Sequence, residues 1–395
     1  MKSELMKILS SKQRKIVIIG IIIFSVLIAF LPLLTYDTMT NPNSLVVKKG
    51  VGAFSKEKNR DSASNGVITK KKMNKVLNYY KSFASSDSAY VNCIYKYPTL
   101  SNLLFSAYPE LDINGNKKIK NADDFYKRNW VQIKHRMEDT DQEYTAQEIS
   151  NAVKKAKAIK KPYSSEYSNT WTYAYKTLMF IAMLFSVFAV FMGTRIFSVE
   201  NENSMNLILC TIEEQKLKNI IRNKMNVFIV FLSKMYFMSV GISSVVFFVA
   251  VGTSAWNRQL QIQYFTSLLN ISFGSAYLLF ILIGWLAMIT IGVVTCLINT
   301  IIQKTYTSFV VGFVLFVVPF FLIRFTGLPH IIRKICMLMP INACFFEKII
   351  SSLYTYKIMF FHVLTSTGMI LNLSFLSVVC MVAIEKIYTK SIREG

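Results

Sequence analysis

The segment 196–226 carries charged residues whose types and spacing suit the binding of a protein partner. Acids and lysines alternate there with short apolar runs, and the candidate residues are Glu200, Glu202, Glu213, Glu214, Lys216, Lys218 and Lys224. Complementary charges at an interface set the orientation of a bound partner. The apolar runs can form one side of a short amphipathic helix. The segment therefore predicts a docking site, and the alternative is a helix that lies on a membrane surface.

Residue types that usually carry catalysis or hold metals are sparse. The three histidines are His135, His330 and His362, and none is paired at a metal-ligand spacing. The chain has no Gly-x-Ser-x-Gly, no His-Glu-x-x-His and no phosphate-binding Gly-x-x-x-x-Gly-Lys-Ser/Thr sequence. Asp112–Asn116 looks like the start of a calcium loop, but Lys117 stands where such a loop needs glycine. We therefore expect no catalytic, metal or cofactor residue here and no enzymatic activity of the chain itself.

The elements that must position the candidate residues are membrane-spanning helices. Hydrophobic residues make up 53% of the chain and the mean hydropathy is +0.38, which is more apolar surface than a soluble domain usually buries. A helix needs about 20 apolar residues to cross a bilayer. The stretches that approach this length are Val17–Leu34, Ala174–Met192, Val227–Val251, Ala276–Ile302, Ser308–Ile323 and Met359–Ile384. The sequence thus predicts an all-α polytopic membrane protein with six transmembrane helices.

A long polar insertion separates the first two spans. The predicted divisions are a cytoplasmic amphipathic segment 1–15, a transmembrane helix 16–35, an extracellular domain 36–172, and a membrane domain 173–395 that includes the 196–226 segment. The first span has no small-residue cleavage site after its apolar run, so we expect it to be retained.

We expect the insertion to be a small, mainly helical domain. Helices are predicted at Lys72–Phe83 and Asp123–Met137, and Thr145 with Glu148 forms a capping box before a third helix. Gly50–Gly66 is polar and contains glycine, which predicts a loop.

Basic residues near the ends of short connections predict the orientation in the membrane. They gather in the N-terminal tail, in the 196–226 segment and in the C-terminal tail, and with six spans these regions share one side. Both termini are therefore predicted to be cytoplasmic and the insertion extracellular. The segment 324–357 would then lie outside although it contains Arg333, Lys334 and Lys348, and we expect short interfacial helices in it.

The formal net charge of +23 is spread over the tails and the insertion rather than gathered on one soluble face. Attraction to anionic lipid head groups explains this distribution better than nucleic-acid binding, so we expect membrane lipids as partners and no nucleic acid. No Asp or Glu occurs between Glu214 and Glu347. Ion-driven transporters commonly keep carboxylates within the membrane as relays. Energy for any movement should therefore come from another subunit.

The six cysteines do not suggest a disulfide framework. Cys93 is alone in the insertion. Cys336 and Cys344 could share an outer loop and pair, but buried free thiols are the favoured prediction.

The 196–226 segment resembles the first cytoplasmic loop of the ABC transporter type-2 permease family. In that loop a Glu is followed by Gly-Thr, a leucine-rich run, a Ser/Thr-Thr-Pro turn and a Lys that opens the third span. The positions that match in order are Glu200, Leu207–Leu209, Cys210–Thr211 and Lys224. Ser204–Met205 replaces Gly-Thr, and Ile212 replaces Pro. The six-span layout, the insertion and the segment before the last span also match, so the resemblance covers nearly the whole chain.

The insertion looks like that of permeases from low-GC Gram-positive bacteria, through Phe125–Arg128 and Lys161–Tyr163 leading to Tyr167 and Trp171. The resemblance implies the permease subunit of an ATP-driven exporter in a bacterial plasma membrane. Its partners would be an ATP-binding cassette subunit, which holds ATP and Mg²⁺, and a second permease copy or a homologous permease. An amphipathic or hydrophobic peptide, drug or lipid would be the substrate, and antimicrobial-peptide resistance the role.

Two other classes of function remain open from the sequence. The first is a mechanotransmission or sensory membrane protein that couples an ATPase partner to the extracellular domain without a substrate path. The second, a membrane-embedded enzyme, would require polar groups gathered at one depth, which the sequence does not reveal.

Overall fold

The structure, a computed structural model, describes residues 11–42, 47–111, 119–139, 144–202, 206–325, 327–358 and 361–394. Within these residues, six helices are long and apolar enough to cross a membrane. They are α2 (Ser11–Thr35), α10 (Asn169–Gly193), α13 (Glu214–Val251), α14 (Phe273–Ile302), α15 (Thr305–Leu322) and α19 (Thr365–Glu394). The predicted class, an all-α multi-pass membrane protein, is confirmed.

The centre of the bundle is α14, which packs against α10, α19 and α15. Small residues allow the backbones to approach closely: a Cβ atom on Gly193 of α10 would lie only 2.9 Å from the carbonyl oxygen of Gly292 in α14. On the outside, α2 packs along α13. Ser25 and Ser239 share a hydrogen bond of 2.6 Å there, and Ser243 donates to the carbonyl of Ser25 at 2.9 Å. Hydroxyl pairs of this kind join helices where lipid offers no polar partner.

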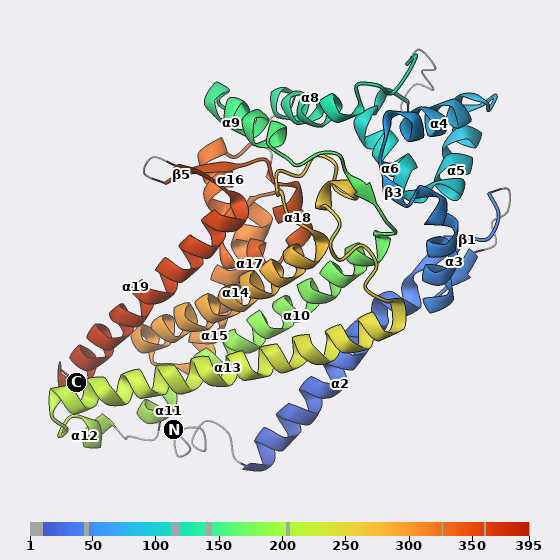
Figure 1. The fold of residues 1–395 in the computed structure, drawn as a ribbon. Coiled ribbons are helices and arrows are strands. Elements are labelled where there is room, and N and C mark those ends of the chain that lie inside the picture. Colours follow the sequence, from blue (N-terminus) through green and yellow to red (C-terminus); the bar gives the residue numbers. More distant parts are fainter. Residues whose placement is uncertain are drawn as a thin grey trace.

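The bundle has two distinct ends (Figure 1). The start of α2 and the end of α19 lie at the same end as the short helices between α10 and α13. The insertion between α2 and α10 lies at the opposite end, and α13 runs the length of the bundle between them. One end of the bundle thus carries the described part of the 196–226 segment together with the start of α2 and the end of α19.

The described part of the insertion contains the helices α3 (Val51–Asp61), α4 (Lys70–Lys81), α5 (Ser86–Lys96), α6 (Pro98–Ala107), α8 (Phe125–Glu138) and α9 (Ala146–Lys157). Two small antiparallel sheets join them. In one, β1 (Asp37–Met39) pairs with β2 (Val47–Lys49), and in the other β3 (Gly66–Val67) pairs with β4 (Ser164–Ser165). The core is aromatic and aliphatic, with Phe54, Leu77 and Phe125 fully buried.

The local predictions for the insertion have mixed outcomes. The two predicted helices correspond to α4 and α8, and the capping box at the start of α9 is formed, with Thr145 and Glu148 bonding reciprocally. The prediction of a loop at Gly50–Gly66 is wrong, because α3 occupies most of it. Tertiary contacts that bury Phe54 and Asp61 on one face outweigh the weak helix propensity of that polar stretch. The calcium-like residues Asp112–Asn116, and the apolar residues before Ser11, lie outside the described residues.

The segment between α15 and α19 folds into short elements, as expected for 324–357. These are α16 (His330–Met337), α17 (Pro340–Ala343), α18 (Phe346–Ser351), β5 (Thr355–Ile358) and β6 (Phe361–Leu364). The sixth span therefore begins at Thr365, after a β-hairpin, rather than at Met359 as predicted. Cys336 and Cys344 are free and buried, which confirms the favoured prediction for these thiols.

Candidate functional site

The 196–226 segment is shorter as a loop than its sequence indicates, because α13 already begins at Glu214. Leu217, Ile221 and Met225 follow at helical spacing and are buried, so one apolar face continues into the span. The prediction that the third span begins near Val227 is therefore corrected, and Lys224 lies inside the helix. Two short helices, α11 (Ser198–Glu202) and α12 (Asn206–Leu209), make the turn from α10.

Glu200 and Lys224 form a buried ion pair that closes this turn. Their side chains are 9% and 7% exposed, and the Lys224 ammonium contacts a Glu200 carboxylate oxygen directly. The other oxygen accepts a hydrogen bond of 2.8 Å from the hydroxyl of Tyr388 in α19. The Tyr388 ring packs against Phe197 at 4.6 Å between centroids. The Glu200 carboxylate thus joins α11 to α13 and to α19, and α19 is far from the other two helices in the sequence.

Asn299, near the end of α14, fixes the start of α11. Its side-chain oxygen accepts from the backbone N–H groups of Phe197 and Ser198 at 3.1 and 3.0 Å, and its amide donates to Ser308 at 3.2 Å. Ser198 also shares a hydrogen bond of 2.7 Å with Thr305. These bonds satisfy helix-end N–H groups that would otherwise be buried without a partner.

Charged pairs on the first turns of α13 reach the C-terminal helix. Arg222 makes two bonds to Glu385, of 2.8 and 2.9 Å. Glu214 contacts Lys218 at 2.6 Å and Arg393 at 3.3 Å. The C-terminal tail predicted from sequence is therefore a continuation of α19 that holds the start of α13.

Only part of the candidate set is left for a partner. Glu213 and Lys216 pair at 3.2 Å, and their side chains are 68% and 74% exposed. Ile208 is 63% exposed beside them in sequence, whereas Leu209 is buried. The side chain of Glu202 lies outside the described part of the chain. The structure thus separates Glu200 and Lys224, which are internal, from Glu213 and Lys216, which are on the surface.

Sequence patterns did not assign four residues to this site, namely Asn299, Arg222, Glu385 and Tyr388. A signal existed for one of them, since Glu385 follows the last span in a chain where acids are rare. No local pattern pairs it with Arg222.

At the other end, the connection 252–272 between α13 and α14 is built into the insertion. The Trp171 indole N–H donates to the carbonyl of Ser254 at 2.7 Å, and Arg258 pairs with Glu166 at 3.0 Å. The Asn129 side chain donates to the carbonyl of Phe265. The bonds of this connection attach the insertion to the far end of α13.

A second attachment joins α9 to α16. Glu148 accepts from Lys334 and also contacts His330 at 3.2 Å. Burial raises the pKa of Glu148, but the hydrogen bonds from Lys334 and from the Thr145 backbone outweigh it and lower the pKa to about 2. His330 thus has Glu148 as a partner among the described residues.

Glu57 of α3 should make stability depend on pH. Burial raises its pKa to about 7, although Arg60 and Asn169 offset part of that effect. The folded state therefore binds a proton that the unfolded state has released between about pH 4.5 and 7, so stability falls as pH rises through this window. In the wild type this effect should lower the free energy of unfolding by on the order of 3 kcal/mol between the two ends of the window, and we expect the Glu57→Gln variant to lose it. Chemical denaturation at both pH values measures it, and equal pH slopes for variant and wild type would contradict the assignment.

The fold and the two attachment sites define a multi-pass α-helical membrane protein with an insertion tied to its bundle. Among the described residues, no three His, Cys, Asp or Glu side chains gather where a metal ion could bind. No family model matches the chain, and no curated protein or solved structure matches it.

Proposed function

We propose that this chain is the permease subunit of an ATP-driven ABC exporter in a bacterial plasma membrane, with both termini cytoplasmic and the insertion extracellular. The proposal combines the resemblance of the 196–226 segment with the geometry around it. ATP and Mg²⁺ are held by a separate cassette subunit, because the chain contains no phosphate-binding loop. A second permease copy or a homologous permease completes the pathway.

The observation that carries the proposal is that the turn between α10 and α13 contains one buried charged pair and one exposed charged pair. The buried pair of Glu200 and Lys224 ties α11 to α13, and Tyr388 ties it to α19, while the pair of Glu213 and Lys216 and the side chain of Ile208 are exposed. A turn tied in this way, with exposed apolar and charged side chains, can receive force from a partner and pass it to the helices.

The same geometry supplies a route for the movement. Force on the turn acts on the first residues of α13, a continuous helix of 38 residues. Its far end leads into the connection 252–272, which is bonded to the insertion through Trp171 and Arg258. Closure of the ATPase subunits would thereby change both the bundle and the insertion, and move an amphipathic peptide, drug or lipid outward.

Reconstitution tests the proposal. The chain is purified from its native host with its bound partners and placed in vesicles with ATP inside or outside. We expect a cassette ATPase to copurify, and ATP to drive accumulation of a labelled amphipathic peptide. Robust ATP hydrolysis by the isolated chain, or no cassette subunit in the purified complex, would contradict it.

Charge reversal at Glu213 should weaken the ATPase contact. The Glu213→Lys variant is expected to bind the cassette subunit roughly tenfold less tightly, because a rim charge at an interface contributes on the order of 1 kcal/mol or more. Affinity is measured by titration of the purified subunit. Glu214→Lys is a poorer choice, because Glu214 also holds Arg393.

The matched control is Glu138→Lys in the insertion. Glu138 pairs with Lys134 one helical turn away, and both are exposed, with 49% and 52% of their side chains accessible. This control should bind like the wild type. Equal loss in both variants would show a general charge effect instead of a docking site.

Mechanotransmission is the second candidate, favoured by the firm attachment of the insertion. Hydrogen bonds join the insertion to the connection 252–272: Asn129 and Arg136 donate to Phe265 and Thr266, and Arg258 of the connection donates to Glu166. A ligand on the insertion could therefore move α13 without any substrate path. ATP-dependent movement of the insertion without substrate accumulation in the vesicles would favour this function over export.

A further inference from the structure

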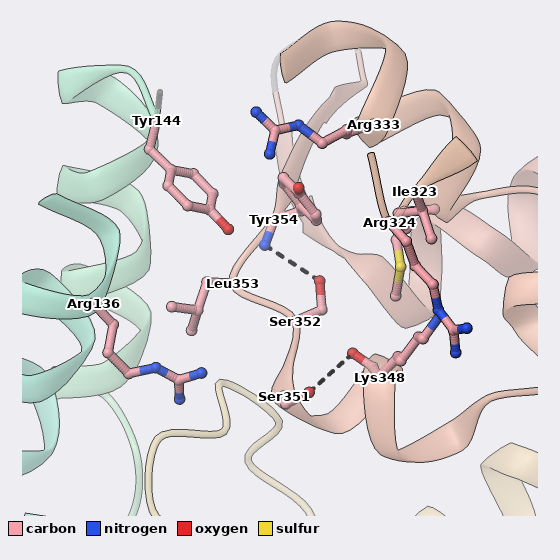
Figure 2. A pocket seen from close by; sticks show the side chains of 11 residues that line it. Arg136, Tyr144, Ile323, Arg324, Arg333, Lys348, Ser351, Ser352, Leu353 and Tyr354 are labelled. Carbon is pink, nitrogen blue, oxygen red and sulfur yellow. Dashed lines mark hydrogen bonds between the residues drawn. The ribbon is translucent and has the colours of Figure 1, made fainter. Parts of the chain in front are cut away.

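A cavity of about 290 Å³ lies between the insertion and the short helices α16 and α18. Figure 2 shows Arg136 entering from the helices of the insertion, with Arg324, Arg333 and Lys348 on the opposite elements. Ser351 and Ser352 lie between these two groups (Figure 2). The cavity is therefore bordered by four positive charges from separate parts of the chain.

None of the described residues that line this cavity is acidic. Glu148 of α9 is bound by Lys334 and His330. The described lining therefore contributes four positive charges and no negative one.

Two of the cations are held against the same aromatic ring. The Arg324 guanidinium lies 4.0 Å from the centroid of Phe320, and the Lys348 ammonium lies 4.9 Å from it. Burial, and then the charge of Arg324, lower the pKa of Lys348. The two like charges therefore repel each other, and an anion bound by both would reduce the repulsion.

The surroundings of the cavity suit an anion that carries apolar chains. Arg324 follows directly after the end of α15, so the cavity lies where a membrane-spanning helix leaves the apolar layer. On α16, Arg333 and Met337 are buried, while Ile331 and Ile335 are 70% and 51% exposed. An amphipathic helix with exposed isoleucines at this level fits the boundary between lipid chains and head groups.

We propose that this cavity binds a phosphate group, and that the phosphate belongs to the head group of an anionic lipid whose acyl chains lie along α16. Arginine forks recognise phosphate oxygens through paired hydrogen bonds, and Lys348 supplies a further point charge. Ser351 and Ser352 line the same space as polar neighbours, and the Ser351 hydroxyl itself donates to the carbonyl of Glu347 at 2.8 Å. The site is independent of whether the chain exports a substrate.

Native mass spectrometry of the full chain in a neutral detergent tests the proposal with three probes. Dioctanoyl phosphatidic acid carries both phosphate and chains, dioctanoylglycerol carries chains alone, and inorganic phosphate carries the anion alone. We expect one phosphatidic acid to bind more tightly than either other probe. In the Arg324→Gln variant its affinity should fall roughly tenfold, because a charge-assisted hydrogen bond is lost.

Arg324 is exposed, so this variant removes little packing besides its contact with Phe320, and Lys348→Gln provides an independent second variant. The control is the Lys75→Gln, Lys127→Gln double variant, which removes exposed charges of the insertion outside the cavity and should bind like the wild type. Equal binding of dioctanoylglycerol, or an equal loss in the control, would overturn the phosphate site. Equal binding of inorganic phosphate would overturn the lipid as its source.

Discussion

The Glu200→Gln variant is expected to be less stable than the wild type by about 3–5 kcal/mol, because it leaves the buried Lys224 ammonium without its counter-charge. Both side chains are almost fully buried, so solvent cannot replace the missing partner. Lys224→Met should have an effect of similar size for the reverse reason, since of its partners among the described residues Glu200 then keeps the Tyr388 hydroxyl alone. Denaturant titration in a mild detergent, followed by tryptophan fluorescence, measures the loss.

The double variant Glu200→Gln, Lys224→Met separates the interaction between the two residues from the contacts that each makes with other residues. With both charges removed, no uncompensated charge is buried, so the double variant should be more stable than either single one. Tyr388→Phe removes a bond to a charged group and should lower stability by about 1.5–3 kcal/mol. If the two single effects simply add in the double variant, Glu200 and Lys224 do not act as one unit.

The second large effect is expected at Trp171. Its side chain is 1% exposed, stacks on Phe273 at 5.8 Å and contacts Trp256 at 5.4 Å, and its N–H donates to Ser254. Trp171→Ala should destabilise the protein by about 3–5 kcal/mol, because it opens a cavity at the junction of α10, the insertion and the connection 252–272. Circular dichroism follows the unfolding, since the variant lacks one fluorescent residue.

Trp130 supplies the comparison for that variant. It lies on α8 at a half-buried position, where its ring is contacted by the Lys157 ammonium at 4.7 Å. Trp130→Ala should therefore lower stability by only about 1 kcal/mol. Comparable losses at the two positions would mean that Trp171 does not anchor the junction.

These two variants act at opposite ends of α13 and so probe whether the ends are coupled. If the chain works as a permease, loosening the turn at Glu200 should uncouple ATP hydrolysis from transport even in the folded fraction. Loosening the junction at Trp171 should change the response of the insertion more than ATPase association. Assays of both variants in the same vesicles compare these outcomes.

The membrane class of the protein could be predicted from the sequence because the transfer of apolar side chains into lipid depends on local composition. Five of the six predicted spans overlap their helices almost throughout, and the capping box of α9 formed from residues three positions apart. Short-range patterns of this kind need no knowledge of the rest of the chain. The location of the candidate site in the 196–226 segment also came from local charge and apolar alternation.

Local patterns did not reveal which candidate residues would be buried. Glu200 and Glu213 lie in the same segment and have the same side chain, yet one is paired inside the turn and the other is exposed. The difference arises because Tyr388 reaches Glu200 from a distant part of the chain and the fold of the turn brings Lys224 against it. Likewise α3 formed in a polar stretch because distant residues bury Phe54.

The sequence by itself thus determined whether each stretch of this protein favours lipid or water. The free energy of transfer between the two is set by the stretch's own residues. Only the tertiary structure decided which charges neutralise each other, how the insertion is attached to α13, and that four cations border one cavity. These outcomes depend on the relative positions of segments separated by scores of residues, and the energies that select them act only after the helices have packed.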